Sequence, residues 1–211
     1  MKIAILCDSE THPINPYLQN WIETNQSFNI SIHRDPKTLQ GGDILFLISC
    51  NIIIKQEILD LYTHVLVIHA SNLPKGRGWS PHIWQILEGK TNITVSLLEA
   101  SEKVDTGKIW KKIQCDIPET FLYDEINDRI FKAELELMDY AVMNYANIQP
   151  VEQDPKITPS YYPKRQPSDS ELDINSSIIS QFNKIRVSDP NRYPAFFYIN
   201  GIKFNLFITK E

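Results

Sequence analysis

Short apolar runs separated by polar segments fill the first half of the chain. Lys2–Leu6 and Ile44–Ile48 are apolar runs of the kind found in strands buried on both faces of a sheet. Further strands are predicted at Phe28–His33, His64–His69, Ile93–Leu98 and Ile109–Ile113. Helices are expected between them, at Tyr17–Glu23, Lys55–Tyr62 and Pro81–Leu87.

A long helix is predicted to follow these strands. Thr120 is its expected N-cap, and Asp124 and Glu125 suit the first turn. Apolar residues then recur at helical spacing, at Leu122, Ile126, Ile130, Ala133 and Leu137. Alternating strands and helices predict an α/β fold, a Rossmann-like and mostly parallel twisted sheet with flanking helices. Such sheets bind ligands at the carboxyl ends of their strands.

The composition changes after Asn147. Residues 149–170 carry several prolines and many polar side chains, which predicts a long connection. A short helix and two strand-like runs follow, at Ser176–Arg186, Ala195–Ile199 and Phe204–Ile208. Asn200-Gly201 between the two runs favours a tight hairpin. The expected units are a catalytic core, a linker segment and a small C-terminal helix-hairpin unit, at residues 1–148, 149–174 and 175–211 respectively.

The 211 residues are 42% hydrophobic and 22% charged, as in an ordinary globular protein. The formal net charge of -5 gives no support to a nucleic-acid partner, because phosphate contacts favour a basic surface. Three cysteines without a CxxC pair argue against a metal site and suit a reducing cytosol. The apolar N-terminal run is too short for a signal peptide, and no run is long enough to cross a membrane. We therefore expect a cytoplasmic protein without a membrane partner.

The most informative stretch is HASNLPKGRGWSPHIWQILEG, at residues 69–89. His69 ends a buried strand, and a loop rich in Gly, Pro and Ser follows it. Thirty-six residues later Asp105 lies in VDTGKI, again between two strands. Each residue alone has a simpler explanation, since a lone histidine is more often a core residue and Asp-x-Gly is common in turns. Adjacent strands could bring the two together, and a carboxylate beside a histidine fixes its tautomer and stabilises its charged form.

These motifs resemble a known enzyme family. The sequence resembles the formyltransferases related to glycinamide ribonucleotide and methionyl-tRNA formyltransferase. The matching positions are His69, Ser71, Leu73-Pro74, Gly78, Pro81 and the VDTG tetrad. The segments RQPSDSELDI and IRVSDPNRYPAFF resemble the linker and C-terminal part of amino-sugar formyltransferases. The loop LPKGRGWSPHIWQILEG looks closest to the enzymes of pseudaminic acid synthesis. The resemblance covers about residues 40–200.

The resemblance implies that a formyl group passes from 10-formyltetrahydrofolate to an amine. The amine attacks the formyl carbon, and hydrogen-bond donors meet the oxyanion where its charge develops. By the resemblance, His69 donates to that intermediate or shuttles a proton near it, and Asp105 orients and supports His69. No metal is implied.

One position departs from the family pattern. The family has an asparagine two residues before the histidine, where this chain has Val67, and a valine side chain has no hydrogen to donate. Replacement by another donor is preferred over loss of activity, because His69, the loop at residues 75–81 and Asp105 all match. The nearest polar candidates in the sequence are Asn51, Ser71 and Asn72.

The resemblance also indicates where ligands bind. Folate is expected against Asn51, Ile52, Ile53, Glu99, Val104 and Asp105, largely through backbone groups. The alternative is that the isoleucines are core or helix-entry residues. The expected acceptor is a nucleotide-linked amino sugar, such as a UDP-4-amino-4,6-dideoxy sugar of pseudaminic acid type. It is expected to contact Lys75, Gly76, Arg77, Gly78, Trp79, Ser80, Arg165 and Asp169. Basic groups among glycines can contact phosphates and Trp79 can stack on a base or sugar, although a solvated loop and a surface linker would look the same.

Two other functions are left open. In a formyltetrahydrofolate hydrolase, water would replace the amine. A non-catalytic folate- or sugar-nucleotide-binding protein would have lost its activity with the asparagine. Initiator tRNA is not an expected substrate, because the chain is acidic and its C-terminal unit lacks a long lysine-rich extension. A small aromatic core or a homodimer contact is expected from Tyr193, Phe196, Phe197, Tyr198 and Phe204.

Overall fold

The computed structural model describes residues 1–211 and has a six-stranded sheet at its centre, in the order β2-β1-β3-β4-β6-β7. The parallel strands are β1 (Lys2–Leu6), β2 (Asn29–His33), β3 (Gly42–Leu47) and β4 (Tyr62–His69). The antiparallel strands at one edge are β6 (Asn92–Glu99) and β7 (Ile109–Asp116). This arrangement confirms the predicted α/β fold with a mostly parallel sheet.

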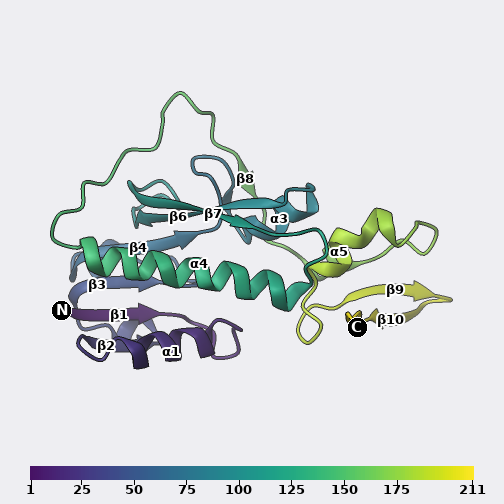
Figure 1. Cartoon of the computed structure of the whole chain (residues 1–211), viewed down its shortest axis with the longest axis horizontal. Helices are drawn as coiled ribbons and strands as arrows, with labels where there is room; N and C mark the ends of the chain where they lie inside the picture. Colours follow the sequence, from purple (N-terminus) through teal and green to yellow (C-terminus); the bar gives the residue numbers. More distant parts are fainter.

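Helices cover the two faces of the sheet unequally (Figure 1). The larger core lies under α1 (Asn15–Thr24), α3 (Pro81–Leu87) and α4 (Tyr123–Asn144). On the other face, α2 (Gln56–Leu59) and several connections cover a smaller cluster around Leu45, Leu47 and Val65. Even α4, the longest helix, is not apolar enough to cross a membrane.

Most expected elements are present, with boundaries shifted by a few residues. The predicted helix at Lys55–Tyr62 is reduced to α2, because Tyr62 is buried as the first residue of β4. The prediction of Thr120 as the cap of α4 is wrong. Leu122 is the N-cap residue, and its backbone N–H donates to Glu125 Oε2 at 2.9 Å. A first-turn carboxylate thus satisfies a backbone donor that a Thr120 hydroxyl was expected to satisfy.

The long connection after α4 is tied to the rest of the molecule at several points (Figure 1). Val151 forms an antiparallel bridge with Ile109 at the start of β7. Further on, β8 (Tyr161–Tyr162) pairs in parallel with β5 (Arg77–Gly78) in the loop after β4. We call residues 151–163 the strap. The small β5–β8 sheet was not predicted, because a strand of two residues leaves no periodic pattern in the sequence.

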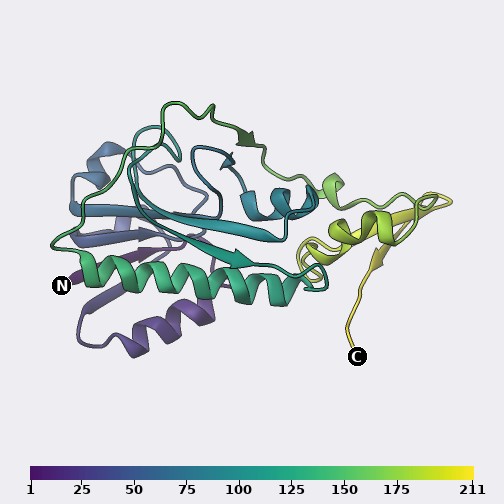
Figure 2. The same ribbon diagram turned by 45° about the horizontal axis from the view of Figure 1, so that its top comes forward.

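The C-terminal unit extends away from the sheet (Figures 1 and 2). Its helical part is shorter than predicted, a 3-10 turn η3 (Ile179–Gln181) followed by α5 (Phe182–Arg186). The hairpin of β9 (Ala195–Ile199) and β10 (Ile202–Leu206) has positive φ at Asn200 and Gly201, as the predicted tight turn requires. Two more 3-10 turns are η1 (Pro36–Thr38) and η2 (Pro167–Ser170).

A buried arginine joins this unit to the core. Arg186 is 1% exposed, and its guanidinium donates to the carbonyl oxygens of Pro118 and Phe121 just before α4. The face of the hairpin that carries Phe197, Phe204 and their neighbours is apolar along its whole length, and its outer part is exposed. The homodimer stays a prediction.

Glu134 is a buried carboxyl on the inner side of α4, only 9% exposed, and burial raises its pKa from 4.5 to about 8. An acid whose folded pKa lies above its unfolded value loses stability as the pH rises through this window. Glu134→Gln should therefore raise the free energy of unfolding by about 2–4 kcal/mol at pH 8 and change it little at pH 4.5, as measured by urea denaturation. Glu136→Gln, at an exposed position of the same helix, is the matched control and should show no such pH dependence. An equal effect of Glu134→Gln at both pH values would contradict the prediction.

Candidate active site at the end of strand β4

His69 is the last residue of β4 and lies on the same face of the sheet as Val65 and Val67. Its side chain is buried, and ring Nε2 lies 2.8 Å from the carbonyl oxygen of Gly76. A carbonyl oxygen only accepts, so Nε2 donates the proton in this hydrogen bond. On the other side of the ring, Nδ1 lies 3.5 Å from Asp105 Oδ1. Both ring nitrogens therefore face oxygen acceptors. A ring with a proton on each nitrogen can donate to both of them.

Asp105 reaches His69 from the connection between β6 and β7. Because β6 is antiparallel to β4 and its last residue Glu99 pairs with Leu66, this connection must fold back to bring Asp105 to His69. Asp105 itself adopts a left-handed conformation with φ of 57°. Its Oδ2 accepts a hydrogen bond from the Gly78 backbone N–H at 2.8 Å, and its side chain is 5% exposed. The pair is thus shielded from water, which strengthens the electrostatic interaction between the carboxylate and the ring.

Two polar side chains on neighbouring strands hold the loop that follows His69. Ser96 pairs with His69 in the sheet and donates its hydroxyl to the carbonyl oxygen of Ser71 at 2.7 Å. Lys112 pairs with Ser96 in turn and donates to the carbonyl oxygen of Leu73 at 2.7 Å. Burial lowers the pKa of Lys112. Neither residue was predicted, because a single polar residue in a strand carries no signal of its own.

Val67 occupies an apolar row across three strands. It pairs with Leu47 on β3 and with Leu98 on β6, and it is half-buried itself. Side chains directly opposite each other in a sheet lie on the same face, so the three form one apolar surface next to His69. This surface offers no side-chain donor to an oxyanion.

The three polar candidates differ in their surroundings. Asn51 is exposed and donates from its backbone N and its Nδ2 to the Asp8 carboxylate, at 2.9 and 3.3 Å. Asn72 is also exposed, and its Oδ1 accepts from a lysine ammonium at 2.8 Å. Ser71 is 1% exposed, and its hydroxyl has no hydrogen-bond partner. That hydroxyl lies beside Gly76, the residue whose carbonyl holds His69.

The residues expected to hold folate lie on two segments that follow the strands flanking β4. Ile52 and Ile53, after β3, are 42% and 73% exposed, so neither belongs to the core. Val104, between β6 and β7, is 53% exposed. The Glu99 carboxylate oxygen Oε1 accepts from the Trp110 indole at 3.3 Å and lies 3.3 Å from the His64 ring, in contact with the larger core.

Part of the expected acceptor site is open to solvent. Lys75, Trp79 and Ser80 are all exposed on the loop after His69. The Lys164 ammonium lies 4.7 Å from the centre of the Trp79 ring, at a distance typical of a cation–π contact. An aromatic face and an ammonium group therefore lie side by side where the loop meets the end of the strap.

The other expected acceptor residues are engaged within the protein. Arg77 is 9% exposed and donates to Gln153 Oε1 at 2.7 Å and to the Tyr161 hydroxyl at 3.2 Å, while its Nε is buried without a partner. Asp169 Oδ2 accepts from the Gln166 backbone N–H at 2.6 Å and so closes the turn η2. These contacts point Arg77 away from solvent and give Asp169 a local role.

Arg165 retains a free hydrogen-bond donor. It is half-buried and donates to Ser170 Oγ at 3.2 Å, while its Nε is buried without a partner. Burial lowers its pKa, and no carboxylate lies within ion-pair distance of it. A guanidinium in this state is available to an anionic ligand.

A further histidine near the site was not selected from the sequence. Burial lowers the pKa of His82 to about 4, and the positive charge of the Arg165 guanidinium acts in the same direction. His82 is therefore neutral at pH 7 and can both donate and accept a hydrogen bond. In the sequence, the one feature that marks His82 is its position directly after Pro81, within the motif-bearing residues 69–89.

The sheet and the site together define an α/β protein with a buried histidine–carboxylate pair, a pair suited to proton transfer. The family model described as formyl transferase matches residues 7–142. The chain belongs to the formyl transferase family.

Individual relatives add detail to this assignment. The chain is 32% identical over 174 residues to a methionyl-tRNA formyltransferase of Sulfurovum sp., an alignment that covers 82% of this chain and 55% of the relative. Its fold is similar to HypX from Aquifex aeolicus in complex with tetrahydrofolic acid (TM-score 0.77, 22% identity, 99% of this chain and 37% of that chain). It is also similar to a sugar N-formyltransferase from Shewanella sp. (TM-score 0.74, 17% identity, 100% of this chain and 98% of that chain). The chain spans about half the length of the curated relatives it matches.

Proposed function

We propose that this chain catalyses N-formyl transfer from 10-formyltetrahydrofolate to the amine of a nucleotide-linked amino sugar. The buried His69–Asp105 pair, in a member of the formyl transferase family, is the observation that carries the proposal. Transfer of a formyl group to an amine needs a donor for the developing oxyanion and a route for the amine proton. A histidine held by a carboxylate supplies both.

His69 acts through Nε2 in this proposal. At rest, that nitrogen donates to the Gly76 carbonyl oxygen. During the reaction it exchanges this acceptor for the formyl oxygen, on which negative charge develops as the amine attacks. Asp105 keeps Nδ1 protonated and stabilises the charged ring. As the formyl–folate C–N bond breaks, the charged His69 gives its Nε2 proton to the departing folate nitrogen, and the proton that the amine gives up then restores Nε2–H.

The surroundings of Val67 fit a flat folate ring system. Val67, Leu47 and Leu98 offer an apolar floor beside His69, and Ile52 and Val104 carry exposed apolar side chains on the two flanking segments. Exposed apolar groups next to a polar site are typical of ligand pockets. Formyltetrahydrofolate supplies the one-carbon group when it is bound there.

We propose Ser71 as the donor that replaces the family asparagine, because its buried hydroxyl lacks a partner and lies next to Gly76. Ser71→Ala should lower kcat about tenfold or more in a steady-state assay, since one oxyanion donor is lost. Asn51→Ala and Asn72→Ala are the matched controls and should each change kcat less than twofold. Unchanged turnover in all three variants would contradict the replacement of the asparagine by any of them.

Amino sugars linked to a nucleotide are favoured over tRNA as acceptors. Trp79 and Lys164 offer a stacking face and an ammonium group, and Arg165 has a buried donor without a partner. Together they suit the ring and the diphosphate of a sugar nucleotide. The net charge of -5 disfavours a polyanionic tRNA.

A panel of acceptors tests the proposal. The protein is incubated with 10-formyltetrahydrofolate and, in parallel, with a UDP-4-amino-4,6-dideoxy sugar, with methionyl-tRNA or with water alone, and products are identified by mass spectrometry. The proposal expects the formylated sugar only. Formyl-methionyl-tRNA as the main product, free formate at the same rate in every reaction, or folate binding without turnover would each overturn it in favour of a different function.

A further inference from the structure

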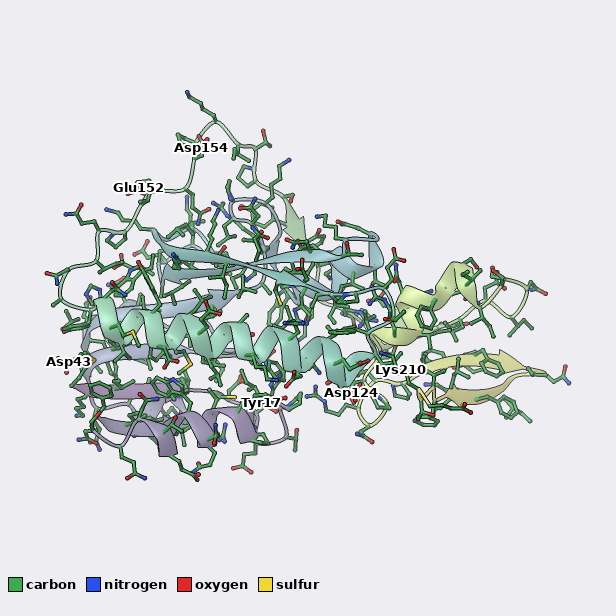
Figure 3. The ribbon with its side chains drawn as sticks, viewed as in Figure 1. Tyr17, Asp43, Asp124, Glu152, Asp154 and Lys210 are labelled. Carbon is green, nitrogen blue, oxygen red and sulfur yellow. The ribbon has the colours of Figure 1, made fainter.

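Gln153 is the inward-facing residue in the first half of the strap. Its neighbours Glu152 and Asp154, both labelled on this segment in Figure 3, are exposed, and Glu152 forms an ion pair with Lys108 at 3.3 Å. Gln153 is half-buried and directs its amide toward the site. It has no assigned role in formyl transfer.

The Gln153 amide makes three hydrogen bonds that join the two loops of the site. Its Nε2 donates to the carbonyl oxygens of Asp105 and Gly107, at 2.8 and 3.0 Å. Its Oε1 accepts from the Arg77 guanidinium at 2.7 Å. Only one orientation of the amide satisfies all three, because a guanidinium only donates and a carbonyl only accepts. A glutamine is therefore specifically suited to this place.

The loop that carries Asp105 needs such support. It folds back over the sheet, and Asp105 keeps a left-handed backbone that costs energy in a non-glycine residue. The outer part of the loop is bonded within itself, through Ser101 and Thr106 to the Lys103 carbonyl oxygen. The carbonyl oxygens of Asp105 and Gly107 are instead held from outside the loop by Gln153.

Arg77, at the other end of the Gln153 hydrogen bonds, lies beside the residues that hold His69. Arg77 stands between Gly76, whose carbonyl oxygen accepts from His69, and Gly78, whose N–H donates to Asp105. A shift of Arg77 against the Asp105 loop would therefore change the separation of His69 and Asp105.

We propose that Gln153 is a positioning residue that fixes the distance between His69 and Asp105 by joining their two loops. It acts through Asp105 and does not contact the substrate. The kinetic part of its test rests on the proposed function, whereas the spectroscopic part does not.

Gln153→Ala is expected to lower kcat for formyl transfer by about tenfold to a hundredfold, because small displacements of catalytic groups have effects of this size. The KM for folate and for the sugar should stay within twofold. Gln153→Glu should lower kcat at least as much, since the glutamate keeps an acceptor for Arg77 but offers no donor to the two carbonyl oxygens. Asp154→Ala, at the exposed neighbouring position, is the matched control and should behave like the wild type.

A double-mutant cycle separates positioning from a general effect on folding. In an Asp105→Asn background, Gln153→Ala should have little further effect on kcat, because its target is already lost. Independent, multiplying effects of the two substitutions would overturn the proposal.

The spectroscopic part uses the free protein. The 15N NMR signals of the His69 ring, assigned by their absence in His69→Ala, report its contact with Asp105 without any substrate. Gln153→Ala should move them toward their positions in Asp105→Asn, whereas Asp154→Ala should not. Signals identical to the wild type in Gln153→Ala would overturn the proposal, even if the protein proved to have another activity.

Discussion

Replacing Asp105 by asparagine is expected to lower kcat by a hundredfold or more while leaving the fold intact. The asparagine amide oxygen can still accept from the Gly78 N–H, so the loop keeps its anchor. Its NH2 group would then face His69 Nδ1 and hold that nitrogen as an acceptor, so the ring stays neutral. His69→Ala removes the donor itself and should lower kcat at least as much.

Steady-state formyl transfer with the sugar nucleotide measures both variants, and circular dichroism at increasing temperature checks that they are folded. His33→Gln is the control, because the His33 ring bonds only the hydroxyls of Ser31, on the same edge strand β2, and of Thr38, in η1. It should retain kcat within twofold. A folded Asp105→Asn protein with wild-type kcat would show that the carboxylate has no part in catalysis.

Gly107→Ala should have the second largest effect, on both stability and activity. A Cβ at this position would lie 1.8 Å from the Glu99 carbonyl oxygen, so the backbone must move. We expect the free energy of unfolding to fall by about 2–3 kcal/mol, as in overpacked cores, and kcat to fall more than tenfold because Asp105 moves with the loop. Urea denaturation and the formyl transfer assay measure the two effects.

Gly89→Ala provides the contrast for Gly107. Gly89 has a positive φ of 86°, but a Cβ there would meet nothing within 4 Å. Gly89→Ala should lower the free energy of unfolding by about 1–2 kcal/mol through backbone strain and should keep the wild-type kcat. Equal losses of activity in the two variants would mean that crowding at Gly107 does not reach the site.

The regular parts of the fold were predictable because local signals agree with the tertiary structure. Helix α3 has its predicted bounds, since Pro81 begins it and Gly89 follows its end. The direction of β6 and the pairing of β5 with β8 were not predictable. Strand direction depends on how the chain crosses between strands, and a pair of two-residue strands depends on contacts between residues 77–78 and 161–162.

The candidate site was predictable where a motif marks it. His69 precedes a glycine-rich loop and Asp105 lies in an Asp-x-Gly turn, each after a strand, and the structure brings His69 Nδ1 to 3.5 Å from Asp105 Oδ1. Their catalytic roles stay predictions. Ser96, Lys112 and Gln153 left no such mark, because each is a lone polar residue whose partners are distant in sequence. Arg77 was selected for its basic charge, and its contact with the acceptor stays a prediction, since two of its donors bond Gln153 and Tyr161 while its Nε is buried without a partner.

The outer tip of the strap, residues 154–159, is exposed throughout and is fixed at both ends. Gln153 anchors one end on the Asp105 loop, and the Ser160 hydroxyl accepts from the Gly76 backbone N–H at the other. Because lengthening a flexible surface loop costs little free energy, this tip should accept an inserted peptide tag or a fluorescent label. A label there would sit on the one segment that touches both halves of the site, and could report in real time when a ligand pulls them apart.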